Sequence, residues 1–178
     1  TANQAVIARY GDEIAAAAAA RGVYVLIEAA VGGGIPIIEP LKQSLGGNRI
    51  QRVSGIINGT TNYILSRMAD EGAAYADVLA DAQRLGYAEA DPAADVQGGD
   101  AADKIAVLAW LAFGVDPTAL TVHTAGLGDD IDMLRKADVQ GRMATLANPE
   151  TKKLEDRAMF VRKVDGVDGF IAVAISSK

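Results

Sequence analysis

Nine consecutive apolar residues, Ile105 to Phe113, constrain the fold more than any other part of the chain. A helix that is apolar on every side is usually buried, so the run predicts a central helix over residues 100–113. Asp100 follows two glycines and is expected to be the N-cap of this helix, which places Lys104 in its first turn. Five carboxylates stand in or just before this turn: Glu89, Asp91, Asp95, Asp100 and Asp103.

Opposing effects act on the positive charge of Lys104 at this position. The helix dipole and burial both oppose a positive charge there, whereas nearby carboxylates favour it. Asp100 lies four residues before Lys104 and shares its helix face, and the loop 86–99 can bring Glu89 and Asp95 to the same place. A lysine in such surroundings is a candidate proton carrier. The same pattern is typical of a solvated acidic loop ending in an ordinary salt bridge. A metal site is a further alternative, although the spacing does not match a calcium loop.

Composition excludes several classes of function. The 178 residues, half of them hydrophobic, are enough for a sizeable core. No apolar run reaches the roughly 18 residues of a membrane span, and no signal-peptide pattern opens the chain. The net charge of −6 and the scattered basic residues argue against nucleic-acid binding. We therefore expect a cytoplasmic protein with no membrane or nucleic-acid partner. The absence of cysteine excludes disulfides and thiol nucleophiles.

Hydrophobic periodicity and capping residues divide the chain into helices and strands. They predict helices over residues 4–20, 36–45, 60–71, 75–85 and 100–113, and strands over residues 23–30, 49–57, 158–165 and 170–177. The last two strands would form a closing hairpin, and residues 120–148 are interpreted as connecting structure with a helix near 131–136. We expect a single α+β domain over residues 1–178, with a mixed, mostly antiparallel sheet and helices packed on one face.

Two glycine-containing turns follow predicted strands. Gly32 to Gly34 lacks the spacing of a dinucleotide-binding turn and has no Walker lysine, but its backbone carbonyls could face a cation or a close-packed turn. Gly59 to Thr61 is expected to turn a strand into a helix, where its amides and hydroxyls could bind a carboxylate. A simple N-cap explains the second turn equally well.

Three segments in this order, EAAVGGGIPII (28–38), GIINGTTNYIL (55–65) and LGYAEADPAADVQGGDAADK (85–104), resemble the substrate-binding and catalytic domain of the homoserine dehydrogenase family. The resemblance covers residues 1–113 closely and the hairpin 158–177 loosely. It implies an NAD(P)-dependent interconversion of L-homoserine and L-aspartate 4-semialdehyde in threonine and methionine biosynthesis. It also implies a homodimer that pairs through the sheet of this domain.

The resemblance assigns roles to individual residues. It implies that Lys104 is the general acid/base on the substrate hydroxyl, with Glu89 and Asp100 beside it in the catalytic group. The substrate site would be formed by Gly59, Thr60, Tyr87, Glu89 and Asp95. A monovalent cation, usually sodium, would be surrounded by the backbone carbonyls of Glu28, Val31, Gly33 and Ile35.

The chain departs from the family at its beginning. The family's N-terminal dinucleotide-binding half has no counterpart before Thr1, so we expect the cofactor site to be missing. A motif that reads T-A-N-K in the family here ends in Gln4, which can donate a hydrogen bond but cannot transfer a proton. An alternative is therefore a non-catalytic remnant of the family that serves for dimerisation or amino-acid binding. A generic α+β ligand-binding domain is a third interpretation.

Overall fold

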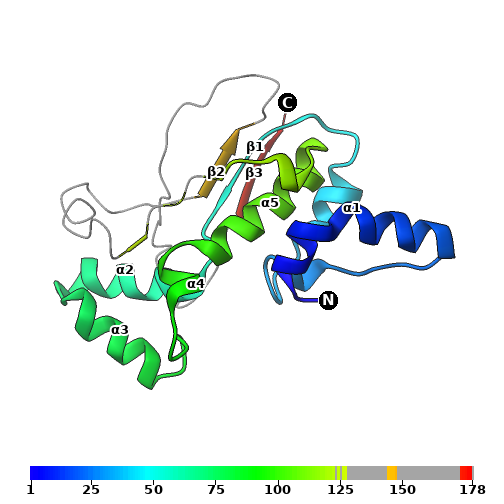
Figure 1. Ribbon diagram of the computed structural model, residues 1–178. Helices are drawn as coiled ribbons and strands as arrows, with labels where there is room; N and C mark the ends of the chain where they lie inside the picture. The colour runs from blue at the N-terminus through cyan, green and yellow to red at the C-terminus, as the bar shows by residue number, and fades with distance from the viewer. Residues whose placement is uncertain (123, 125, 128–143, 148–172, 178) are drawn as a thin grey trace.

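The computed structural model of the chain describes residues 1–122, 124, 126–127, 144–147 and 173–177 (Figure 1). The α-helices are α1 (Gln4–Arg21), α2 (Gly59–Glu71), α3 (Tyr75–Arg84), α4 (Ala93–Val96) and α5 (Gly99–Phe113). Shorter helical turns are η1 (Glu28–Ala30), η2 (Pro40–Ser44) and η3 (Pro117–Ala119). The strands are β1 (Ile50–Gly55), β2 (Ala144–Ala147) and β3 (Val173–Ser177).

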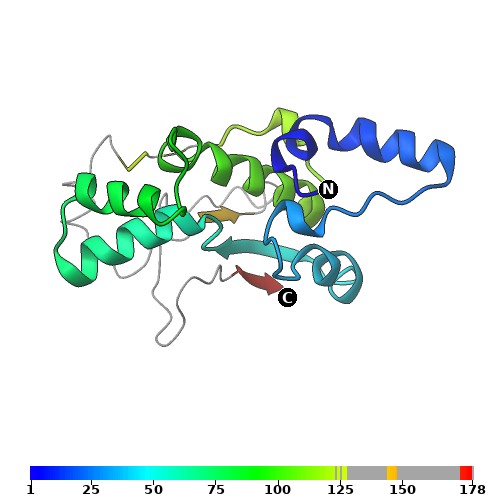
Figure 2. The same cartoon turned by 90° about the horizontal axis from the view of Figure 1, so that it is seen from below.

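The strands form a sheet in the order β2-β1-β3, and β1 pairs antiparallel with both neighbours. Val53 of β1 lies opposite Leu146 of β2 and Ile175 of β3. Helix α5 runs along one face of β1, as Figure 2 shows, and its Val107 and Leu108 belong to the same buried cluster as Val53. The predicted strand 158–165 and the helix near 131–136 lie outside the described residues, so the complete sheet and the fold class remain predictions.

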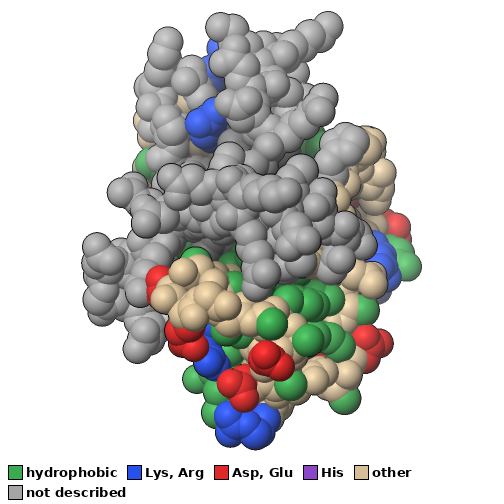
Figure 3. Space-filling model, turned by 90° about the vertical axis from the view of Figure 1, so that its left-hand side faces the viewer, with side chains coloured by type: hydrophobic (Ala, Val, Ile, Leu, Met, Phe, Trp, Pro, Cys, Tyr) green, Lys and Arg blue, Asp and Glu red, His purple; other side chains and the backbone are tan. Residues whose placement is uncertain are grey.

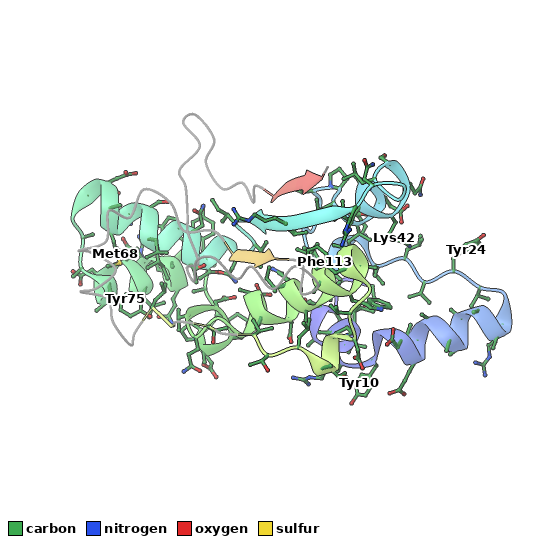
Figure 4. All side chains as sticks on the ribbon, turned by 90° about the horizontal axis from the view of Figure 1, so that it is seen from above. Tyr10, Tyr24, Lys42, Met68, Tyr75 and Phe113 are labelled. Atoms are coloured by element: carbon green, nitrogen blue, oxygen red, sulfur yellow. The ribbon has the colours of Figure 1, made fainter. Side chains whose placement is uncertain are left out.

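Two hydrophobic clusters lie towards opposite ends of the described part of the molecule (Figure 1). The first is built from α1, residues 27–41, β1 and the apolar part of α5. The second is built mainly from α2 and α3; Met68 belongs to it, and Tyr75 packs against it (both labelled in Figure 4). The exit from β1, the start of α2 and the start of α5 lie where the two clusters adjoin. That junction holds the polar residues of the candidate site.

Helix α5 begins one residue earlier than the sequence predicts. Its N-cap is Gly98, which has φ 84°, and the helix starts at Gly99. This left-handed conformation favours glycine, and the chain uses it to pass directly from α4 into α5. Asp100 is therefore the second residue of the helix and not its cap, and Lys104 lies in the second turn. The prediction of an Asp100 cap was wrong.

The predicted strand over residues 23–30 is also wrong. Residues 23–27 form a loop, and η1 occupies the remainder. The side chain of Tyr24 points away from the protein (Figure 4), and this residue is 95% exposed. β-Branched composition favours an extended chain, but a strand also needs a neighbouring strand to share its hydrogen bonds. Here the Leu26 carbonyl instead accepts a hydrogen bond from the Thr1 ammonium at 2.6 Å.

The remaining predictions that concern described residues agree more closely with the structure. The predicted helices at 4–20, 60–71, 75–85 and 100–113 agree with α1, α2, α3 and α5 to within one residue at each end. The helix expected at 36–45 is shorter than predicted: residues 38–44 are helical, and η2 forms the part from Pro40. None of the helices in the described ranges has the length and apolar character needed to cross a membrane.

Candidate functional site

The turn between β1 and α2 forms the centre of the candidate site. The chain leaves β1 at Gly55, passes through the buried Ile56 and Ile57, and enters α2 at Gly59. Asn58 is the N-cap of α2, because its Oδ1 accepts a hydrogen bond from the Thr61 amide at 2.8 Å. The sequence-based prediction of a strand-to-helix turn here is confirmed, and the cap comes from Asn58.

Lys104 points from α5 into this turn. Its Nζ lies 2.8 Å from Oδ2 of Asp100 and donates a hydrogen bond of 2.9 Å to the Ile57 carbonyl. The side chains of Lys104 and Asp100 are only 15% and 11% exposed. Such shielding makes this pair electrostatically stronger than a surface salt bridge, and it argues against the solvated acidic loop considered from sequence.

Asp100 and Asp95 are neighbours because the Asn58 amide joins them. The Nδ2 atom of Asn58 donates to Asp95 Oδ1 at 2.7 Å and to Asp100 Oδ2 at 2.9 Å. The other oxygen of Asp100, Oδ1, accepts a hydrogen bond from Gln4 Nε2 at 2.8 Å. Residues from α1, α4, α5 and the β1–α2 turn thus form one polar cluster. It combines an amine with two carboxylates, which suits proton exchange beside a bound cationic group.

The predicted substrate-site residues of α2 and the loop after α3 adjoin each other. The Thr60 hydroxyl donates to the Tyr87 carbonyl at 2.6 Å, and the ring of Tyr87 lies 4.9 Å from that of Tyr63. Tyr87 remains 57% exposed, so its ring is available to a ligand. Gly59 is also exposed, one residue from the Asn58 cap.

Glu89 is placed differently from the other predicted acids. It is exposed, and its backbone carbonyl is held by Gln83 Nε2 at 3.1 Å. Within the described ranges, the Lys104 ammonium contacts Asp100 and the Ile57 carbonyl but makes no ion pair with the Glu89 carboxylate. The structure therefore brings together Lys104, Asp100 and Asp95, while Glu89 lies on the loop that carries Tyr87.

An ion-pair network fixes α2 against α3 and thereby supports this loop. Arg67 contacts Glu71 at 2.6 Å and Asp81 at 2.9 Å, and it donates to the Tyr63 hydroxyl at 3.0 Å. Hydrogen bonds from Arg67 and Arg84 lower the pKa of Asp81. Figure 3 shows this end of the molecule, where acidic and basic side chains surround apolar ones. The network holds Tyr63 in place beneath the Tyr87 ring.

The four residues predicted to surround a cation lie on one tight loop, 28–35. Gly33 has φ 62°, and the Ile35 amide donates to the Gly32 carbonyl at 3.0 Å. The Glu28 carboxylate closes the loop by accepting hydrogen bonds from the amides of residues 37, 38 and 39 at 2.5, 2.8 and 2.7 Å. Because this carboxylate is engaged, Glu28 could serve a cation only through its backbone carbonyl, as predicted. In the described ranges, no three acidic or histidine side chains gather as a metal site.

Glu28 gives this loop a pH-dependent stability. Burial raises its pKa, but the hydrogen bonds from residues 37, 39 and 38, with help from Lys42, outweigh that effect and lower the pKa below the ordinary 4.5. The carboxylate therefore stabilises the fold fully above pH 4.5, and this contribution is lost as the pH falls through the lowered pKa.

We expect Glu28→Gln to lower the free energy of unfolding by about 1–3 kcal/mol at neutral pH, because an amide cannot accept all three hydrogen bonds. Urea unfolding of the two proteins at a series of pH values measures this difference, with the exposed Glu13→Gln as control. The difference should shrink in acid, where the wild-type carboxyl is also protonated. A difference that does not change with pH would contradict the assigned role.

Two residues of the polar cluster were not among the sequence-based site candidates. Asn58 could have been recognised as an N-cap, since it precedes a helical pattern, but nothing in its local sequence indicates contact with Asp95 and Asp100. The Ile57 carbonyl, which holds Lys104, leaves no signal in the sequence at all. Gln4 was noted only as a departure from a motif, and the structure shows that it binds Asp100.

Comparisons with known proteins all point to the same family. Residues 36–173 match the family model described as homoserine dehydrogenase. The homoserine dehydrogenase of Synechocystis is 75% identical over 114 residues, which cover 64% of this chain and 26% of that protein.

Two solved structures are similar as well. The crystal structure of a homoserine dehydrogenase from Thiobacillus denitrificans has a TM-score of 0.80 and 42% identity, over 99% of this chain and 43% of that one. A hyperthermophilic archaeal homoserine dehydrogenase in complex with NADPH has a TM-score of 0.73 and 31% identity, over 83% of this chain and 44% of that one.

The chain thus spans between about a quarter and less than half of the length of these relatives. Within that span, the family model covers most of the chain, including the β1–α2 turn, α4 and α5. The residues that the structure gathers around Lys104 lie in the matched region, apart from Gln4. The chain belongs to the homoserine dehydrogenase family.

Proposed function

We propose that this chain forms the substrate-binding and proton-transferring part of a homoserine dehydrogenase, which interconverts L-homoserine and L-aspartate 4-semialdehyde with NAD(P). The observation that carries the proposal is the placement of Lys104 between Asp100 and the Ile57 carbonyl, with Asp95 beside them. An amine shielded from solvent and fixed by two partners is arranged for proton exchange with one nearby hydroxyl.

Each residue of the cluster then has a chemical role. Lys104 in its neutral amine form accepts the hydroxyl proton when homoserine is oxidised, and the ammonium so formed returns the proton when the semialdehyde is reduced. Asp100 holds the lysine in place. The carboxylates of Asp95 and Glu89 bind the ammonium group of the substrate. Gly59, Thr60 and Tyr87 line the substrate site.

No residue of this chain is assigned to the nicotinamide cofactor. The sequence contains no G-x-G-x-x-G turn, and its triple glycine belongs to the loop closed by Glu28. NADPH is bound by the similar archaeal enzyme. The proposal for this chain therefore concerns the substrate side of the reaction.

The same proposal includes a cation and a second copy of the chain. We place a monovalent cation such as sodium at the backbone carbonyls of Glu28, Val31, Gly33 and Ile35. This placement is supported by the tight loop and by the engagement of the Glu28 carboxylate with three amides. The homodimer and the place in threonine and methionine biosynthesis belong to the proposal through the family resemblance, and the cytoplasmic location belongs to it through the composition of the sequence.

Titration calorimetry of the full chain with L-homoserine tests the proposed site. We expect saturable binding at one site per chain, and NADP-linked oxidation of homoserine wherever the cofactor is also held. D-Homoserine is the matched control, because with its ammonium group at Asp95 and its hydroxyl group at Lys104 its α-carboxylate points in a different direction from that of L-homoserine. A folded chain that binds neither enantiomer would contradict the proposal.

A second function is favoured by one observation. The Gln4 amide donates to Asp100 where the family motif has a lysine, so one cation of the family's arrangement is replaced by a neutral group. This change suits a non-catalytic member that binds an amino acid or dimerises. Binding of homoserine without turnover, in the presence of every other component of the reaction, would favour this alternative, and turnover would eliminate it.

A further inference from the structure

The side chain of Asn58 contacts three groups of the candidate site, as many as that of Asp100, although no part in binding or catalysis has been assigned to it above. It is 7% exposed and uses both ends of its amide. The oxygen accepts from the Thr61 amide, and the nitrogen donates to both Asp95 and Asp100. Asn58 therefore connects the start of α2 to the two carboxylates of the site.

The chemistry of its partners fixes the orientation of this amide. A backbone N–H needs an acceptor, and the two carboxylates need donors. Turning the amide over would set the nitrogen against the Thr61 N–H and the oxygen against two anions, which would lose three hydrogen bonds at a buried position. The nitrogen must therefore face Asp95 and Asp100.

We propose that Asn58 is a positioning residue for the reaction: its amide holds the carboxylates of Asp95 and Asp100 side by side, which keeps Asp100 on Lys104 and Asp95 free to receive the substrate ammonium. This inference rests on the proposed function. Asn58 contacts two acids of the site, and no contact with the reacting atoms is assigned to it.

The neutrality of Asn58 is part of its role. Two adjacent carboxylates repel each other by about 1 kcal/mol in water and more where solvent is excluded. A lysine or arginine between them would relieve that repulsion, but it would also neutralise the site that must attract an ammonium group. An amide supplies hydrogen bonds to both acids and leaves the negative charge of Asp95, which Lys104 does not pair with, for the ligand.

The backbone around Asn58 adds a second connection. The carbonyl of Ile57, the preceding residue, accepts the hydrogen bond from Lys104, and Gly59 and Thr60 follow directly. A single turn thus carries the acceptor for the lysine, the donor for both acids and the residues proposed to face the substrate. A displacement of the Asn58 side chain would move these groups relative to one another.

The substitution Asn58→Asp separates the capping role from the positioning role. Aspartate has the same shape and caps a helix as well as asparagine does, so the bond to the Thr61 amide is retained. It has no donor, however, and it sets a third carboxylate against Asp95 and Asp100. Asn58→Ala removes both roles. The double variant Asn58→Asp with Asp95→Asn restores the net charge and one donor–acceptor pair between positions 58 and 95.

We expect Asn58→Asp to abolish the preference of the chain for L-homoserine over L-2-aminobutyrate, which lacks the hydroxyl, as completely as Asn58→Ala does. Calorimetry with both ligands measures this preference. Urea unfolding should show that Asn58→Asp is less stable than wild type, and that the double variant regains a large part of the loss. Because the double variant keeps the wild-type charge, its stability shows whether Asn58 holds the two acids together, even if Asn58→Asp alone does not fold.

Retention of wild-type stability and ligand preference by Asn58→Asp, with losses confined to Asn58→Ala, would overturn the proposal and leave Asn58 as a helix cap. Failure of the double variant to regain stability would overturn it as well. If the wild-type chain binds no homoserine, the proposed function fails, and the unfolding measurements still decide whether Asn58 holds the two acids together.

Discussion

Replacing Lys104 with methionine is expected to lower the rate of homoserine oxidation by about a hundredfold or more, the usual contribution of a general acid/base. Methionine fills a similar volume but cannot accept the hydroxyl proton. The lysine is held in this position by Asp100 and the Ile57 carbonyl at 2.8 and 2.9 Å. Steady-state kinetics with saturating NADP, in a protein that joins this chain to a cofactor-binding part, measures the effect.

Two controls separate chemistry from charge. Lys104→Arg keeps the positive charge beside Asp100 but remains protonated, so it should bind homoserine while failing to oxidise it at the wild-type rate. Lys42→Met removes an exposed lysine from η2 and should leave the rate unchanged. Near-normal oxidation by both Lys104 variants would show that another group carries the proton.

Asp100→Ala is expected to cause the largest loss of stability in the site, about 3–5 kcal/mol in the free energy of unfolding. The carboxylate accepts hydrogen bonds from Gln4 and Asn58 and pairs with Lys104, and its side chain is only 11% exposed. Removing it takes the acceptor from the Gln4 amide, and it leaves the Lys104 ammonium with the Ile57 carbonyl and the Asn58 amide with Asp95 as their remaining acceptors. Urea unfolding followed by circular dichroism measures the difference.

The isosteric Asp100→Asn should lose less stability, because it keeps one acceptor oxygen for the cluster. Asp12→Ala removes an exposed acid from α1 and should change the free energy of unfolding by no more than about 0.5 kcal/mol. An equally small effect of Asp100→Ala would mean that Asp100 and Lys104 do not form a shielded pair in solution.

The helices were predictable from sequence because their signals are local. Asn3 caps α1 and Gly22 ends it in a left-handed conformation, and both residue types are typical of helix boundaries. The prediction of a strand over residues 23–30 was wrong for the opposite reason, since apolar composition does not show whether a segment will pair with a neighbouring strand. Strand β2 was missed because ATLA is too short and too small in its side chains to show alternation.

The site was predictable only where its residues lie close in sequence. Asp100 and Lys104 are four residues apart, so helical spacing alone placed them together, and the structure confirms their ion pair. Asn58 reaches Asp100 across 42 residues, and Gln4 reaches it across 96. Contacts of that range depend on how α1, α5 and the β1–α2 turn pack, which local patterns do not encode. The family resemblance assigned the acids and the lysine but gave no role to Asn58.

The affinities of the chain for L-homoserine and L-2-aminobutyrate, measured by calorimetry for wild type and Lys104→Met, test the central claim most directly. A hydrogen bond between Lys104 and the substrate hydroxyl predicts that wild type prefers homoserine by roughly tenfold or more. The preference should vanish in Lys104→Met. Equal affinities in the wild type, or a preference that survives the substitution, would show that Lys104 does not meet the hydroxyl.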